Sequence, residues 1–187
     1  MNTLFMDEKS FEKARLYLTG LITASIWSLL AWGHFHGGVP SHHILNRADL
    51  PEISNWWGGL LLPLLAWFLF SRTKKRLTAS PENLRTAIAG FFSALVFGLS
   101  LSAFFTFGHG QICGYMMQGL MLAALFFPIY RSECILGFVL GMTFTFGAIL
   151  PTGVGLILAL MGAGLYLFVR RGFLFLLSKF LRVAPDN

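Results

Sequence analysis

Apolar runs long enough to cross a bilayer alternate with short polar segments along most of the chain. Six such runs cover residues 16–33, 56–71, 86–107, 112–130, 134–150 and 154–169. A membrane-spanning helix needs about 20 predominantly apolar residues, and each run is close to that length. The pattern therefore predicts an all-α integral membrane protein with six transmembrane helices.

The composition supports a membrane protein and leaves little room for a soluble domain. Of the 187 residues, 56% are hydrophobic and 12% are charged, whereas a soluble domain has about 25% charged residues. No signal-peptide cleavage site follows the first apolar run, which we expect to be a retained helix. We divide the chain into a cytoplasmic lead (residues 1–15), a six-helix transmembrane domain (residues 16–172) and an amphipathic cytoplasmic tail (residues 173–187).

The distribution of lysine and arginine predicts the orientation in the membrane. If the N-terminus is cytoplasmic, Arg47 is the only one of the 14 basic residues on the outer side. Basic residues collect on the cytoplasmic side of membrane proteins, so we expect both termini in the cytoplasm of a multi-pass protein of the cell inner (plasma) membrane. Because the basic residues flank the membrane, the positive charge does not indicate nucleic-acid binding.

The segment between the first two apolar runs, residues 34–55, is the longest polar connection. Connections in helix bundles usually have about 2 to 8 residues, and longer ones tend to be functional or disordered. This one contains Pro40, Pro51 and a Gly-Gly pair, and Trp56-Trp57 follows it, which is not a disordered composition. We predict a long folded outer loop, and we call residues 34–55 the outer cap.

The predicted topology places all five histidines at the outer face. Imidazole and thiolate ligands suit zinc, copper or iron. We therefore predict a transition-metal site there, with these candidate ligands: His34, His36, His42, His43, His109 and Cys113. In extended backbone, His34-x-His36 would direct both rings to one side, and His109 and Cys113 share a helix face if a helix starts at Gly110.

A plainer interpretation of the histidines is also open. Their spacing does not match a zinc signature such as H-E-x-x-H. Each histidine is also suited to the end of a helix at the membrane interface, where its ring bonds backbone carbonyls. The metal site remains our leading hypothesis, because ionisable groups within a membrane are functional by default.

Two carboxylates of the outer cap, Asp49 and Glu52, are the candidate catalytic residues. They flank Pro51 just before the second apolar run. One role is general acid/base chemistry on a bound substrate, and another is to hold a ligating imidazole through its second nitrogen. The alternative is helix capping, since acidic residues favour the start of a helix.

Outside the outer face, the sequence indicates mainly structural roles. Ser80-Pro81-Glu82 is typical of a helix start. Glu133 is expected to cap the fifth helix or to pair with Arg131. The glycines of the last two apolar runs allow close helix packing.

Three classes of function fit these observations. The first is a membrane-embedded enzyme or metal-handling protein that acts on a lipid or small molecule at the outer face. The second is a substrate-binding subunit for uptake of a small solute or vitamin, with a pocket under the cap. The third is a structural subunit of a membrane complex, with a membrane-protein partner or a second copy. Walker, G-x-S-x-G and Rossmann motifs do not occur in the sequence, so nucleotide hydrolysis and serine hydrolysis have no visible residues to carry them.

Two resemblances accompany these classes. The run Glu52-Ile53-Ser54-Asn55 is similar to the Glu and Ser-Asn elements of alkaline ceramidase-type membrane hydrolases, which would imply zinc held by histidines. The late His-x-x-x-His of that family has no counterpart, since no histidine follows His109. In size, number of spans and long first outer loop, the chain also resembles the substrate-binding subunits of vitamin uptake transporters.

Overall fold

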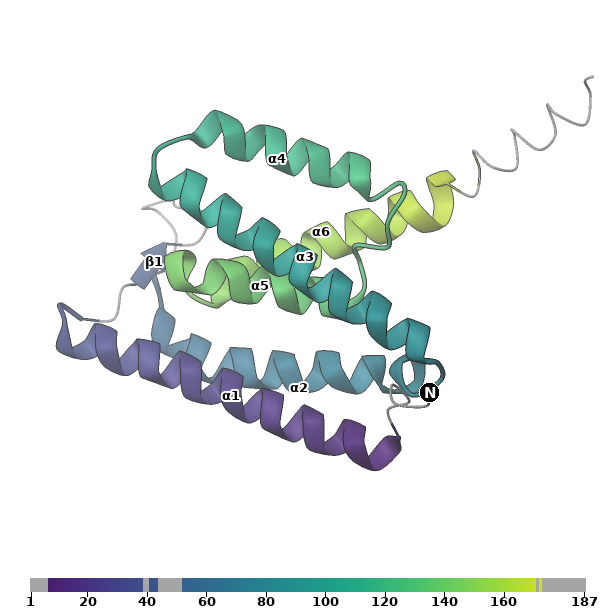
Figure 1. Cartoon of the computed structure of the whole chain (residues 1–187). Coiled ribbons are helices and arrows are strands. Elements are labelled where there is room, and N and C mark those ends of the chain that lie inside the picture. Colours follow the sequence, from purple (N-terminus) through teal and green to yellow (C-terminus); the bar gives the residue numbers. More distant parts are fainter. Residues whose placement is uncertain (1–6, 39–40, 44–51, 171, 173–187) are drawn as a thin grey trace, which may run out of the picture.

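The computed structural model describes residues 7–38, 41–43, 52–170 and 172, and Figure 1 shows their arrangement. Within these residues, six α-helices run back and forth along roughly one direction. They are α1 (Glu8–Phe35), α2 (Gly58–Leu77), α3 (Pro81–Thr106), α4 (Gly110–Ala123), α5 (Ser132–Phe146) and α6 (Ile149–Gly164). A short π-helix, η3 (Leu165–Val169), continues α6.

The helical fold is that of a membrane protein. Three helices are long and apolar enough to cross a bilayer, namely α1, α3 and the continuous segment Ile149–Val169. The helix α5 is also apolar but shorter. The prediction of an all-α membrane protein is therefore confirmed at this level.

The two ends of the helix bundle differ: one carries a pair of short strands, and the other carries basic residues. At one end, which we call the cap end, the strands β1 (Ser41–His43) and β2 (Glu52–Ser54) form an antiparallel pair. They are followed by the 3-10 helix η2 (Asn55–Trp57). At the other end, which we call the basic end, α1 begins and the last turn of α2 carries Lys74, Lys75 and Arg76 (Figure 1).

Local sequence signals account for several helix boundaries. The Ser80 hydroxyl accepts a hydrogen bond from the Glu82 backbone N–H at 3.2 Å, and Pro81 opens α3, as the sequence predicts. Asp7 caps α1 in the same way, accepting from the Ser10 N–H at 3.1 Å. Hydrogen bonding to the side chain of Ser10, and then to its backbone N–H, lowers the pKa of Asp7 below its ordinary value.

Helix boundaries differ from the prediction in several places. The helix α5 ends at Phe146 and α6 begins at Ile149, so residues 151–153, between the last two predicted spans, are helical. The helix α1 continues to Phe35, so His34 is helical and does not begin a loop. The helix α4 ends at Ala123, and the apolar residues up to Tyr130 form turns. Pro128 lies in this connection, and proline removes a backbone donor and disfavours helix in the residue before it.

The core is built on a close contact between α3 and α5. A Cβ atom on Gly137 or Gly141 of α5 would collide with the backbone of α3, at Phe91 and Leu95 respectively. Gly98 of α3 faces the same contact from the other side. Small residues let two helix backbones approach and gain packing energy within a bilayer, so the predicted role of these α5 glycines is confirmed.

The turn between α5 and α6 fits beneath the outer cap. Gly147 has a φ angle of 70°, a conformation that glycine adopts at little cost. A Cβ atom at this position would collide with the side chain of Asn55, which is buried. Part of the outer cap is thus folded onto the bundle, as its composition predicted.

Candidate functional site

The first two candidate ligands point in different directions. His34 lies in the last turn of α1, with its ring edge-on to Trp56 at 6.0 Å between ring centroids. The His36 ring stacks on Trp32 at 3.7 Å, and its Nδ1 lies 2.9 Å from the Trp32 carbonyl oxygen. The prediction that both rings share one side is wrong, because residues two apart at a helix end are about 200° apart around its axis.

The second outer turn holds His109 and Cys113 against backbone carbonyls. The helix α4 does begin at Gly110, the condition under which these two residues share a face. The His109 Nδ1 lies 2.9 Å from the Phe107 carbonyl oxygen. The Cys113 Sγ donates to the Leu101 carbonyl of α3 at 3.7 Å, a long contact. These contacts match the plainer interpretation of the histidines as interface residues.

The other outer candidates are described only in part. His42 and His43 lie in β1, and Glu52 in β2 pairs with His43 in the strand register. Asp49 and Arg47 lie outside the described residues. Within the described part of the chain, no three His, Cys, Asp or Glu side chains are grouped closely enough to hold a metal ion. The metal site and the catalytic roles of Asp49 and Glu52 stay predictions.

A larger candidate site lies between α3, α4, α5 and α6. A cavity of about 550 Å³ extends there, and its wall is mainly apolar, with Phe97, Leu120, Phe138 and Leu158 among its residues. Small-molecule sites typically have volumes of about 300 to 1,000 Å³ and mostly apolar walls with a few polar groups. The cavity therefore has the size and lining of a ligand site.

The charged groups of this cavity lie at the start of α5. Arg131, Glu133 and Cys134 line it there. The Glu133 side chain is only 9% exposed, and its Oε1 accepts a charge-assisted hydrogen bond from Arg76 at 2.5 Å. Its Oε2 is buried and has no hydrogen-bond partner within the described part of the protein. An unsatisfied buried acceptor of this kind costs about 1 to 3 kcal/mol or more.

The partner of Glu133 differs from the predicted one. We expected Arg131, two residues away, but the structure pairs Glu133 with Arg76, which lies 57 residues earlier in the chain. The last turn of α2 lies beside the first turn of α5 at the basic end, and this contact brings the two residues together. The position of Glu133 in the first turn of α5 also places its charge at the positive end of that helix.

A second, smaller cavity lies beneath the outer cap. Its volume is about 230 Å³, and Trp32, Asn55, Thr143 and Gly147 are among its lining residues. The uptake hypothesis predicted a sizeable pocket in this place. The structure instead puts the larger cavity toward the basic end.

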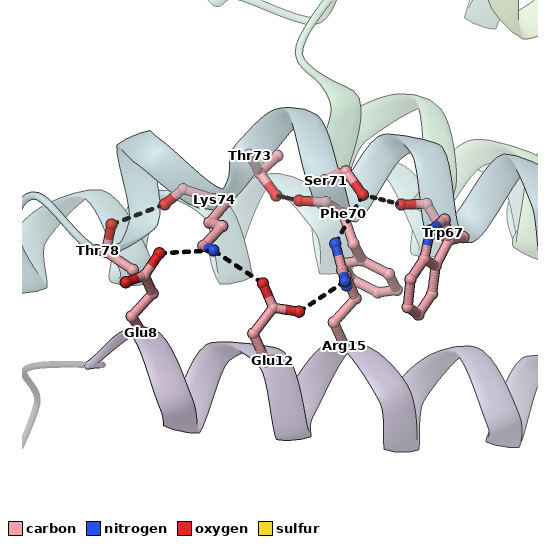
Figure 2. A network of polar contacts seen from close by, with 9 residues as sticks. All are labelled: Glu8, Glu12, Arg15, Trp67, Phe70, Ser71, Thr73, Lys74 and Thr78. Atoms are coloured by element: carbon pink, nitrogen blue, oxygen red, sulfur yellow. Dashed lines mark hydrogen bonds and ion pairs between the residues drawn. The ribbon is translucent and has the colours of Figure 1, made fainter.

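A cluster of charges fastens α1 to α2 near the basic end, as Figure 2 shows. Lys74 binds Glu8 at 2.7 Å and Glu12 at 2.9 Å. Arg15 binds Glu12 at 2.6 Å and donates to the Ser71 hydroxyl at 2.9 Å. The cluster holds the end of α2, and therefore Arg76, in place beside α5.

Searches against protein families, curated proteins and solved structures find no match to the chain.

Proposed function

We propose that the chain is a multi-pass protein of the cell inner membrane that binds a small, largely apolar molecule in the cavity between α3, α4, α5 and α6. The observation that carries this proposal is an apolar cavity of about 550 Å³ between four helices, with the charged residues Arg131 and Glu133 in its wall at the start of α5. This is the uptake hypothesis of the sequence analysis with its binding site moved toward the basic end.

The proposal includes six spans with both termini in the cytoplasm. The alternating direction of the helices and the basic residues at the end of α2 support this topology. With 14 and 15 residues, α4 and α5 are only about 21 to 23 Å long at 1.5 Å per residue, less than the hydrocarbon core of about 30 Å. The apolar turn residues that follow α4, such as Phe126 and Phe127, lengthen its apolar stretch, and local thinning of the bilayer accommodates the remaining mismatch.

The test compares cavity-filling and control variants by native mass spectrometry of protein released from nanodiscs. Ala94→Phe adds a large side chain to the cavity wall, whereas Ala103→Phe adds the same side chain at an exposed position of the same helix. We expect a bound small molecule on the wild-type protein and on Ala103→Phe, and its loss from Ala94→Phe. The same bound masses on all three proteins would contradict the proposal.

A second candidate function is binding of a transition metal at the cap end. The support for it is that the end of α1 (His34, His36), the strand β1 (His42, His43) and the α3–α4 turn (His109) all lie at this one end (Figure 1). The test is elemental mass spectrometry of the purified protein beside a His34→Ala/His36→Ala variant. We expect near-stoichiometric zinc, copper or iron that falls in the variant. A wild-type protein that stays metal-free after incubation with each ion would rule this candidate out.

A further inference from the structure

We infer that the outer side of α4 binds the same side of a second copy of the chain, so that the protein forms a homodimer in the membrane. The inference uses the six-span topology proposed above, in which α4 lies in the bilayer, and it is independent of the ligand of the cavity.

The helix α4 turns one side to the bundle and the opposite side outward. It lies along the outside of the bundle, next to α3 (Figure 1). Met116, Met117 and Leu120 pack against the core. On the opposite side, exposed residues form a row that spans about 60° around the helix axis, at about 100° per residue. The row, which we call the outward face, consists of Gln111, Tyr115, Gln118 and Leu122.

The spacing of the outward face is that of a seam between two helices. Its residues follow one another at intervals of four, three and four, which is the alternation of the a and d positions of a coiled coil. Gly114 lies beside the row, and an added Cβ atom there would meet open space. A second helix can therefore approach α4 closely on this side.

The glutamines indicate that protein, and not lipid, covers the outward face. Gln118 lies near the middle of α4 and is exposed in the single chain. Hydrocarbon offers neither donors nor acceptors, so a side-chain amide turned toward it loses the hydrogen bonds that water would supply. Glutamines of transmembrane helices hydrogen-bond across helix interfaces instead. We therefore expect a second helix against this face.

The chemistry of the outward face favours a second copy of this chain as the partner. Two copies with the same orientation in the membrane are related by a two-fold axis along the membrane normal, so their α4 helices are parallel. At the centre of such a contact, each residue meets the same residue of the other copy. A side-chain amide both donates and accepts hydrogen bonds, so two Gln118 side chains complement each other. The outward face carries no charged residue that would repel its own copy.

The first test measures the monomer–dimer equilibrium in liposomes by single-molecule photobleaching over a range of protein-to-lipid ratios. We expect the wild-type protein to dimerise, and Gln118→Leu to associate about tenfold more weakly, because a reciprocal pair of interhelical hydrogen bonds is lost. Ser25→Leu is the matched control, since it replaces a polar residue by leucine at an exposed position of α1, and it should dimerise as the wild type does. A monomeric wild-type protein, or equal association of all three proteins, would overturn the inference.

The second test locates the contact and leaves the glutamines unchanged. Leu122→Cys places a thiol on the outward face, and mild oxidation of native membranes should link two copies through it. Leu160→Cys, at an exposed position of α6, and the wild-type protein, whose Cys113 faces α3, should give little cross-linked dimer. Equal cross-linking of Leu122→Cys and Leu160→Cys would overturn the inference even if Gln118→Leu does not fold. Both tests measure association alone, so their failure leaves the proposed cavity ligand, which Ala94→Phe tests, unaffected.

Discussion

Gly141 of α5 lies against the backbone of Leu95 in α3 so closely that a Cβ atom on Gly141 would sit 2.5 Å from the Leu95 carbonyl oxygen. The two helices therefore cannot keep their present separation if a side chain is added at this position. The walls of the cavity depend on this separation, because α3 and α5 both line it.

The substitution Gly141→Ala should destabilise the protein. Overpacking typically costs about 1 to 3 kcal/mol, and we expect the upper part of that range because the obstacle is backbone. Thermal unfolding of the detergent-solubilised protein measures the effect. Gly119→Ala in α4 is the control, since an added Cβ meets open space there and alanine favours helix by about 0.5 to 1 kcal/mol. Equal melting temperatures for the two variants would refute the close packing.

Loss of the partner of Glu133 should also reduce stability. Arg76→Leu leaves a buried carboxylate unpaired, which we expect to cost about 1 to 3 kcal/mol. This is below the cost for a fully buried pair, since the Arg76 side chain is 26% exposed. Arg72→Leu, at an exposed position of the same helix, should change the free energy of unfolding much less. The double variant Arg76→Leu/Glu133→Leu should recover part of the loss, and a double variant less stable than Arg76→Leu would contradict this account.

The charge cluster of α1 and α2 predicts a loss of stability at alkaline pH. Glu8, and then Glu12, raise the pKa of Lys74 above its ordinary value of 10.5. The folded protein thus holds this proton more tightly than the unfolded chain does. The stabilisation is fully present below the ordinary pKa of 10.5 and disappears as the pH rises through the raised pKa. We expect the melting temperature of Lys74→Met to fall less steeply than that of the wild type above this pH. Lys75→Met, at an exposed position, should follow the wild-type curve, and identical slopes for all three proteins would exclude the effect.

The turn beneath the outer cap predicts a strong effect of a single methyl group. Gly147 combines a φ of 70° with a ψ of −176°, a region that is essentially restricted to glycine and costs other residues about 1 to 3 kcal/mol. Gly147→Ala should therefore lower the melting temperature, with an additional loss from the collision with Asn55. Asn55→Ala in the same chain should relieve the collision but not the backbone strain. Gly153→Ala, where an added Cβ meets open space, should have little effect, and a Gly147→Ala protein as stable as this control would disprove the prediction.

The sequence predicted the helical elements well because their signals are local. The lengths of the apolar runs, the polar segments between them and capping residues such as those of Ser80-Pro81-Glu82 indicate where most helices lie. The errors arose where composition does not separate helix from turn. The apolar residues after Ala123 are typical of a helix but form turns, whereas residues 151–153, predicted to separate the last two helices, are helical.

The candidate site was predicted less well because it depends on tertiary contacts. The elements that carry the histidines lie at one end of the bundle, as the alternation of spans predicted, but the described rings of His34, His36 and His109 each make separate local contacts. The pairing of Glu133 with Arg76 joins α5 to α2, and sequence spacing cannot indicate it. One signal was present: Glu133 is an acidic residue at the start of an apolar run, and such residues are functional candidates by default.

The contact between α3 and α5 has a consequence for biosynthesis. Its two halves are separated in the chain by the whole of α4, so in the six-span topology that we propose, α3 and α4 enter the bilayer before the partner of α3 exists. Until residues 132–146 emerge from the ribosome, the surface of α3 around Gly98 faces lipid or the insertion machinery. The contact between α3 and α5 therefore forms late in translation, after α5 has been synthesised.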